Sequence, residues 1–259
     1  MLLAVDIGNS QTSIGAFESG RWVKTWRLET RYDRTSDEYA SVLMPLFQQA
    51  GFSEDSWAGI ALCSVVPSVE NAFEGFCRDY LKHTPVVIDH RLDLGFELDV
   101  ETPQEVGADR LANAAYAVAH LKLPALVIDF GTATTFDLIT DAPSYQGGVI
   151  LPGVRLAVRA LSGGTSKLPS IPLEFPDSVI GRSTTACIQS GILYGYCDQL
   201  DGLLKRFEKA VGKPCTVALT GGLAYLFQKR LRTESTLIPN LTLEGVALLH
   251  SRGASSLSK

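Results

Sequence analysis

Hydrophobic residues at the start of the chain follow the pattern of short β-strands joined by tight turns. Apolar runs at residues 2–7, 13–17 and 22–28 are separated by polar, glycine-containing turns, which predicts a three-stranded meander. Apolar positions then recur at helical spacing as far as the next glycine, and Thr35 with Glu38 forms a capping-box pattern at the start of that segment. A helix is therefore expected after the meander.

The rest of the chain alternates strands and helices, and its second half begins as the first did. Strands are predicted at residues 59–64 and 85–88 around a helical pattern, and a longer helix is predicted over 104–122. Later predicted elements are strands at 126–129, 134–139 and 147–151 and a long helix at 184–211. This alternation predicts an α/β protein with mixed β-sheets flanked by helices.

Two short sequences occupy the same place at the start of the two halves. Residues 5–10 read Val-Asp-Ile-Gly-Asn-Ser, and residues 128–133 read Ile-Asp-Phe-Gly-Thr-Ala. The match predicts two duplicated subdomains with a cleft between them, which is a common place for a ligand site. We place the boundary within the predicted 104–122 helix, which gives domains at residues 1–115 and 116–259.

Each of these two turns carries the groups that a phosphate-binding hairpin needs. Glycine lets the backbone approach a ligand, backbone N–H groups can face phosphate oxygens, and a carboxylate can hold hydrated Mg²⁺. The first turn supplies Asp6 and Gly8, and the second supplies Asp129, Gly131 and Thr132. Either turn alone could be an ordinary β-turn, but the pair favours nucleotide binding.

A third glycine site follows an apolar strand that begins at Thr216. Gly221 and Gly222 stand between this strand and a helical pattern, where a flat base and ribose could lie against the backbone, although a simple tight connection is an open alternative. The sequence contains no P-loop, no GxGxxG fingerprint and no GxSxG elbow. P-loop ATPases, dinucleotide-binding Rossmann enzymes and serine hydrolases of that type are therefore disfavoured.

Composition and charge narrow the class of protein further. The 259 residues are 46% hydrophobic and 20% charged, which is typical of a globular protein, and the net charge of -5 without a Lys/Arg run argues against nucleic-acid binding. No apolar run reaches the roughly 18 to 20 residues of a membrane span, and Asp6 interrupts the N-terminal run. We expect a cytoplasmic protein without membrane contact. The five cysteines form no CxxC pair, so reduced thiols are expected.

Five motifs occur together along nearly the whole chain. They are DIGNS at 6–10, EVGADRLANAAYA at 105–117, IDFGTATTFDLI at 128–139, GGVILPGV at 147–154 and LTGGLA at 219–224. Together they resemble the type III pantothenate kinases, within the acetate and sugar kinase, Hsp70 and actin superfamily. The resemblance implies duplicated ribonuclease H-like (actin-like ATPase) subdomains. It also implies a transferase that phosphorylates pantothenate with ATP in the first step of coenzyme A biosynthesis. Such an enzyme would be a homodimer and would need Mg²⁺ and a monovalent cation, K⁺ or NH₄⁺.

The resemblance also implies roles for individual residues. The ATP-binding residues would be Asp6, Ile7, Gly8, Asn9, Ser10, Gln11, Thr12 and Ser13, with Thr132, Gly221 and Gly222. The pantothenate contacts would be Gly107, Ala108, Asp109, Arg110 and Thr184, with Asp109 also the catalytic base. Asp129 would bind the monovalent cation, and Asp6 would hold Mg²⁺ through water.

Two positions depart from the family pattern. Ser10 stands where threonine is more usual, which keeps the hydroxyl, and Val100 stands where the family often has a tyrosine, so no substrate role is carried over to Val100. For Thr184, use as a helix N-cap is an alternative to a substrate contact. The helices around residues 111–118 and 188–196 are the expected subunit surfaces.

The expected ionisation of Asp109 can be argued without reference to the family. It lies near the start of a predicted helix and away from the buried stripe, so the helix dipole is expected to lower its pKa and keep it ionised as a proton acceptor. Without the resemblance, a surface pair of Asp109 and Arg110 would be the simpler interpretation. Two other functions stay open, a nucleotide-binding accessory protein without catalysis and a kinase for another small molecule. The complete set of Asp6, Asp109 and Asp129 favours catalysis.

Overall fold

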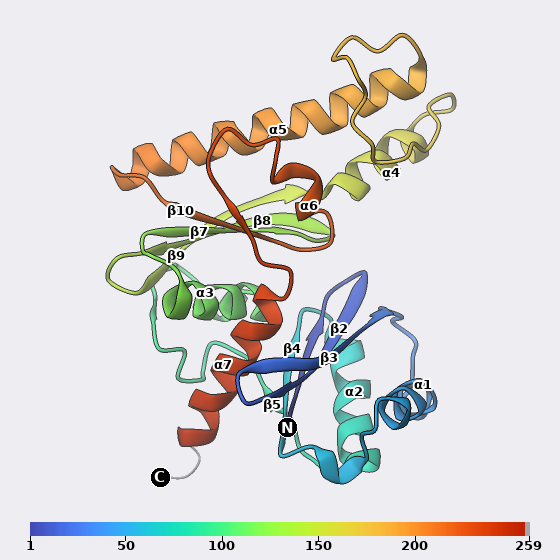
Figure 1. Cartoon of the computed structure of the whole chain (residues 1–259), viewed down its shortest axis with the longest axis vertical. Coiled ribbons are helices and arrows are strands. Elements are labelled where there is room, and N and C mark those ends of the chain that lie inside the picture. The colour runs from blue at the N-terminus through green and yellow to red at the C-terminus, as the bar shows by residue number, and fades with distance from the viewer. Residues whose placement is uncertain (257–259) are drawn as a thin grey trace. The chain divides into compact units, whose positions relative to one another are not determined.

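The computed structural model describes residues 1–256 and divides into two compact units (Figure 1). Unit 1 contains Met1–Leu121, Ala142–Gln146 and the C-terminal segment from Asn240, whereas unit 2 contains Lys122–Asp141 and Gly147–Pro239. The first change from unit 1 to unit 2 thus falls after Leu121, at the end of the 108–120 helix, six residues beyond the expected boundary at residue 115. The return of the C-terminal segment to unit 1 could not be read from the order of elements along the chain.

Unit 1 is built on a five-stranded mixed sheet with the order β3-β2-β1-β4-β5. The strands are β1 (Leu2–Ile7), β2 (Gln11–Glu18), β3 (Arg21–Glu29), β4 (Gly59–Ser64) and β5 (Val86–Val87). β1 is antiparallel to β2 and parallel to β4, and β2 is antiparallel to β3. The predicted meander is therefore confirmed, and the later strands join it through helical crossovers.

Side chains alternate between the two faces of this sheet, as the period of a strand requires. The helices of the unit are α1 (Ser36–Gln49), α2 (Pro67–Tyr80), α3 (Ala108–His120) and α7 (Leu241–Ser256), with short elements η1 (Glu54–Ser56), β6 (Glu97–Leu98) and η2 (Pro103–Glu105). Leu3 and Val5 pack in one buried cluster with residues of α1 and α2, whereas Ala4 and Cys63 pack in another with residues of α3 and α7. Both faces of the sheet are thus covered by helices.

Helices α3 and α7 approach each other closely. A Cβ atom placed on Gly245 of α7 would lie 2.5 Å from the carbonyl carbon of Ala112 in α3, so the contact needs a glycine. Beside it, the buried side chains of Thr242 and Asn113 form a hydrogen bond of 2.9 Å. The α7 helix therefore fixes the position of α3, whose first turn carries Asp109.

Unit 2 repeats the strand order of unit 1. Its elements are β7 (Ala125–Phe130), β8 (Ala133–Thr140), β9 (Ser144–Pro152), α4 (Val154–Gly164), α5 (Thr184–Val211), β10 (Thr216–Thr220), α6 (Ala224–Phe227) and β11 (Thr236–Leu237). The second sheet has the order β11-β10-β7-β8-β9-β6, and β7 is antiparallel to β8 and parallel to β10. Without the added β6, this is the arrangement of β1 to β5. The predicted duplication is thus confirmed by topology.

The long helix α5 covers one face of the second sheet (Figure 1). Its buried residues recur at helical spacing and include Leu193, Leu200 and Leu204, which pack with Leu126 and Ile128 of β7. This packing holds β7 and its turn in place. Within residues 1–256, no helix combines the length and apolar character that crossing a bilayer requires.

Candidate active site

The first glycine turn joins β1 to β2 and presents an exposed tip. The Gly8 N–H donates to the Gln11 carbonyl at 3.0 Å, and a Cβ on Gly8 would lie 3.1 Å from the same oxygen. Asn9, Ser10 and Gln11 are exposed, whereas Asp6 on β1 is half-buried. The tip of the turn is therefore accessible to a ligand, and it lies next to the half-buried carboxylate of Asp6.

The second turn, between β7 and β8, reproduces this arrangement with one residue fewer. In the first hairpin Ile7 pairs with Thr12, and in the second Phe130 pairs with Thr134. Asp6 and Asp129 each occupy the last but one position of the first strand in their sheets. The duplicated sequences thus place two equivalent carboxylates beside two equivalent turns.

Two glycines from distant parts of unit 2 pack against the second turn. Gly221 has a φ of +88°, and a Cβ there would lie 2.6 Å from the Phe130 nitrogen. The Gly153 N–H donates to the Thr132 carbonyl at 3.1 Å, whereas a Cβ on Gly222 would meet nothing within 4 Å. Asp129, Thr132 and Gly221 are therefore brought together as neighbours of one turn. Gly153 was missed as a site residue, although it lies in the GGVILPGV motif and a glycine after a proline is a turn signal.

In unit 1, Asp6 and Asp109 both lie close to the buried thiol of Cys63. Asp6 is in register with Cys63 on the parallel strand β4, so their side chains point to the same face of the sheet. Burial, together with the charges of Asp6 and Asp109, raises the pKa of Cys63 well above its usual value. The thiol is thus neutral, and it lies near two of the three expected carboxylates.

Asp109 is the second residue of α3, and its ionisation differs from the expectation based on the helix dipole. Its Oδ1 atom accepts a hydrogen bond of 2.8 Å from the Arg110 N–H. Burial raises the pKa of Asp109, and the N–H and charge of Arg110 oppose this rise only in part. The expected lowering was wrong because removal of water from the carboxylate outweighs the helix terminus. A raised pKa makes this carboxylate a stronger proton acceptor.

The other residues of the GADR motif shape the start of α3. Gly107 is the N-cap, and a Cβ there would lie 2.5 Å from Asp109 Oδ1, so a side chain would displace the carboxylate. Ala108 is buried, and the Arg110 guanidinium lies 5.7 Å from the centre of the Tyr145 ring. Gly107 and Tyr145 therefore help to set the directions of the Asp109 and Arg110 side chains.

Thr184 is the first residue of α5 and is exposed in unit 2. The neighbouring Ser183 is the N-cap, because its Oγ atom accepts a hydrogen bond of 3.2 Å from the Ala186 N–H. The alternative use of Thr184 as the cap is therefore wrong. The expected substrate residues come from both units, Gly107 to Arg110 from unit 1 and Thr184 from unit 2.

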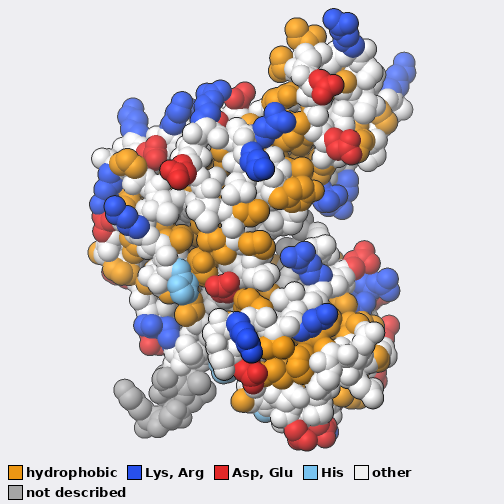
Figure 2. All heavy atoms as spheres, in the orientation of Figure 1, with side chains coloured by type: hydrophobic (Ala, Val, Ile, Leu, Met, Phe, Trp, Pro, Cys, Tyr) orange, Lys and Arg blue, Asp and Glu red, His pale blue; other side chains and the backbone are white. Residues whose placement is uncertain are grey.

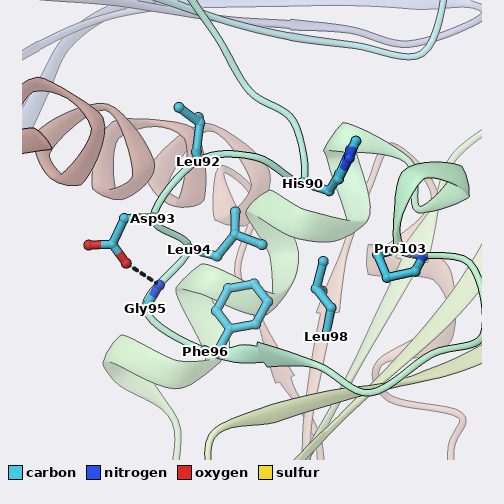
Figure 3. Close-up of a pocket in the computed structure, with 8 residues that line it drawn as sticks. All are labelled: His90, Leu92, Asp93, Leu94, Gly95, Phe96, Leu98 and Pro103. Carbon is cyan, nitrogen blue, oxygen red and sulfur yellow. Dashed lines mark hydrogen bonds between the residues drawn. The ribbon is translucent and has the colours of Figure 1, made fainter. Parts of the chain in front are cut away.

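A pocket of about 510 Å³ lies in unit 1, in the segment that precedes α3 (Figure 3). The residues that line it are His90, Leu92, Asp93, Leu94, Gly95, Phe96, Leu98 and Pro103. Asp93 Oδ1 accepts a hydrogen bond from the Gly95 N–H at 3.1 Å. None of the expected ATP or substrate residues lines this pocket, and neither does Val100. The chemistry of the hairpins and of α3 thus lies outside it.

Comparison with known proteins supports one family. The family model of the type III pantothenate kinases matches residues 2–206. A protein of Bacillus cytotoxicus described as a type III pantothenate kinase is 38% identical over 254 residues, which cover 98% of this chain and 97% of the relative. The match extends over both units.

Two solved structures share the fold at low sequence identity. One is a Campylobacter jejuni protein described as a Baf family transcriptional activator, with a TM-score of 0.60, 17% identity and coverage of 98% of this chain and 99% of the other. The other is the polyphosphate/ATP-glucomannokinase of Arthrobacter sp. strain KM, with a TM-score of 0.51, 15% identity and coverage of 100% and 99%. These similarities, together with the two mixed sheets, confirm the expected duplicated α/β fold of the actin-like ATPases.

Proposed function

Because the chain belongs to the type III pantothenate kinase family, we propose that it transfers the γ-phosphoryl group of ATP to the primary hydroxyl of pantothenate. This reaction is the first step of coenzyme A biosynthesis. The observation that carries the proposal for the site is that Asp6 lies opposite Cys63, and that the first turn of α3, which carries Asp109, packs in the same buried cluster as Cys63. Phosphoryl transfer needs positioned groups and charge neutralisation more than covalent chemistry, and this arrangement supplies both.

The nucleotide is assigned to the glycine turns. We assign the phosphates to residues 6–13 of the first hairpin and to Thr132 of the second, and the base and ribose to the backbone at Gly221 and Gly222. The exposed tip of the first turn and the convergence of Gly153 and Gly221 on the second support this assignment. Backbone N–H groups in such turns are suitable donors to phosphate oxygens.

Pantothenate is assigned to the GADR motif and Thr184. Asp109 accepts the proton of the attacking hydroxyl, and its raised pKa suits this role. Arg110 is a suitable partner for the pantothenate carboxylate, because a guanidinium binds carboxylates with several N–H donors. Gly107 and Ala108 shape the first turn of α3, and Thr184 contributes a hydroxyl from α5.

Mg²⁺ and a monovalent cation fit the carboxylates of the two hairpins. Within residues 1–256, no group of three or more His, Cys, Asp or Glu side chains could hold a metal by itself. Mg²⁺ in kinases commonly uses one or two carboxylates with water and substrate phosphates, so the half-buried Asp6 suffices as an anchor through water. When bound, the ion neutralises phosphate charge. Asp129 is the corresponding carboxylate for K⁺ or NH₄⁺.

The reaction is tested with a coupled assay of ADP release, with and without pantothenate and K⁺. We expect ADP release to depend on both, and activity that is indifferent to both would contradict the proposal. A panel of sugars and short acids as acceptors distinguishes pantothenate from the substrate of another small-molecule kinase.

A nucleotide-binding accessory protein is the alternative from a different class. The likeness to the Campylobacter jejuni protein, at 17% identity, shows only the fold. A protein freed from catalysis has no need of a half-buried carboxylate at position 109, because desolvation of a charge costs stability. Calorimetric ATP binding without turnover at saturating pantothenate and K⁺ would favour this alternative.

A homodimer is part of the proposal, with the helices around residues 111–118 and 188–196 and the exposed apolar residues of unit 2 as candidate contacts. One face of each of these helices is buried within the chain, since Leu111 packs with residues of α7 and Leu193 with the second sheet, whereas Val118 and Gly191 are not buried. Large apolar side chains are exposed elsewhere in unit 2, at Ile150, Leu156, Leu161, Val179 and Ile180. Exposed apolar groups of this kind favour association.

Light scattering tests the dimer directly. We expect an active species of twice the 28.0 kDa chain mass, and a stable, active monomer would contradict the proposal. ATP and pantothenate are the proposed small-molecule partners, and the cytoplasm is the proposed location. On the face drawn in Figure 2, Lys and Arg side chains are interspersed with Asp and Glu, which supports small substrates over nucleic acid.

A further inference from the structure

The three carbonyl oxygens at the tip of the first hairpin all accept hydrogen bonds from one short segment, residues 30–32. The Thr30 hydroxyl donates to the Gly8 carbonyl at 2.7 Å, and the Thr30 N–H donates to the Ser10 carbonyl at 3.1 Å. The Tyr32 hydroxyl lies 3.2 Å from the Asn9 carbonyl and 3.2 Å from Asn9 Oδ1. The carbonyl oxygens of Gly8, Asn9 and Ser10 are thus all hydrogen-bonded to this segment.

The fold explains why this segment lies at the tip. β3 pairs with β2 so that Glu29, its last residue, is opposite Gln11, the first residue after the turn. Residues 30–32 therefore run alongside the turn. Thr30 is buried, and its hydroxyl lies 3.0 Å from that of Thr12 inside the sheet, which anchors the segment.

We propose that residues 30–32 orient the first hairpin for phosphate by keeping its carbonyl oxygens turned away from the ligand. A phosphate group is an anion rich in acceptors, so a carbonyl directed at it repels it, whereas an N–H attracts it. The hydrogen bonds from Thr30 and Tyr32 fix the peptide planes of the turn in the orientation that suits an anion. Thr30 and Tyr32 are thus positioning residues. The inference rests on the proposed role of the hairpin in binding ATP.

Loss of these hydrogen bonds should weaken the binding of phosphate groups and leave other contacts intact. Tyr32→Phe removes a hydroxyl from an exposed ring, and Thr30→Val removes the buried hydroxyl with little change in shape, whereas Thr30→Ser retains it. We expect ADP and inorganic tripolyphosphate to bind about 2- to 10-fold more weakly for each removed hydrogen bond. Adenosine binding and the KM for pantothenate should not change, and Thr30→Ser should bind ADP like the unchanged protein.

The measurement is titration calorimetry with ADP, tripolyphosphate and adenosine, with circular dichroism to confirm folding. Tyr80→Phe is the matched control, because Tyr80 also donates one hydroxyl hydrogen bond in unit 1, to Asp37 at 2.6 Å on another element. Its ADP affinity should be unchanged. Equal weakening of adenosine and ADP would overturn the inference, because the effect would then not be directed at phosphate.

Gly8→Ala separates failure of this inference from failure of the hairpin assignment. Its added Cβ approaches the Gln11 carbonyl at 3.1 Å and disturbs the turn directly. If Gly8→Ala weakens ADP binding while Tyr32→Phe and Thr30→Val do not, the hairpin binds phosphate without help from residues 30–32, and the inference is wrong. If none of the three variants affects ADP binding, the hairpin assignment fails and the inference fails with it.

Discussion

Replacement of Asp109 by Asn separates the proton acceptor from the scaffold that holds it. Asparagine keeps the size of the side chain and an oxygen that can accept the 2.8 Å hydrogen bond from the Arg110 N–H. A general base contributes about 10²- to 10⁴-fold to a rate, so turnover should fall by that factor, equivalent to ~2.7 to 5.4 kcal/mol of transition-state stabilisation. ATP affinity should change by less than about threefold, because Asp109 is assigned to the acceptor.

The dependence of the rate on pH provides a second readout of the same variant. Burial raises the pKa of Asp109 above the ordinary aspartate value of 3.8. The acidic limb of kcat/KM, which reports the base of the free enzyme, should therefore lie above pH 3.8. In Asp109→Asn this limb should disappear.

Stability should move in the opposite direction to activity. Because folding raises the pKa of Asp109, the folded state favours the protonated carboxyl, and its contribution to stability is lost as the pH rises through the folded pKa. Above the folded pKa the ionised, desolvated carboxylate costs stability, so in that pH range Asp109→Asn should unfold at the same or a higher temperature. The difference in Tm should vanish below pH 3.8, where both states carry a neutral acid.

Glu105→Gln is the control for a change of charge near the motif, since Glu105 is exposed in η2 just before Gly107. It should leave turnover and Tm nearly unchanged. Near-full turnover of a folded Asp109→Asn protein would refute the assignment of the base. Asp109 would then be a positioning group in a loose, metaphosphate-like transfer that needs no strong base.

Three further predictions concern the cation, the packing of the second turn and the burial of a thiol. Asp129→Asn should raise the K⁺ concentration needed for half-maximal activity and weaken ATP together, as steady-state kinetics would show, because the cation serves the bound phosphates. Gly221→Ala should lower Tm by more than about 2 to 8 °C, because a left-handed alanine alone costs ~1 to 2 kcal/mol and its Cβ would also lie 2.6 Å from the Phe130 nitrogen. Gly222→Ala, which meets open space, should leave Tm unchanged. Iodoacetamide should label the exposed Cys187 well before the buried Cys63 by mass spectrometry, and equal rates would contradict the burial of Cys63.

The two hairpins could be predicted because their signals are local. In each hairpin, the strand periodicity, the turn glycine and the aspartate lie within about ten residues of one another. No distant contact is therefore needed to interpret the turns at Gly8 and Gly131. The capping box of Thr35 and Glu38 was confirmed for the same reason, with the Thr35 N–H donating to the Glu38 carboxylate at 2.7 Å.

Features that depend on distant parts of the chain could not be predicted in this way. The pKa of Asp109 depends on how deeply the carboxyl is buried, which local sequence does not reveal. Thr30 and Tyr32 belong to no recognised motif. Their position directly after the third strand of a meander nevertheless predicts contact with the first turn, because that strand ends beside it. The division into units also depends on the return of α7, which is a tertiary contact.

The contact between α3 and α7 has a consequence for synthesis on the ribosome. Asn113 and its partner Thr242 are separated by 129 positions, and both segments of unit 2, Lys122–Asp141 and Gly147–Pro239, are made between them. At a synthesis rate of ~5 to 20 residues per second, these positions take roughly 6 to 26 s to make, and the apolar side of α3 is uncovered during that time. Unit 2 therefore has time to fold before α7 can cover the apolar side of α3.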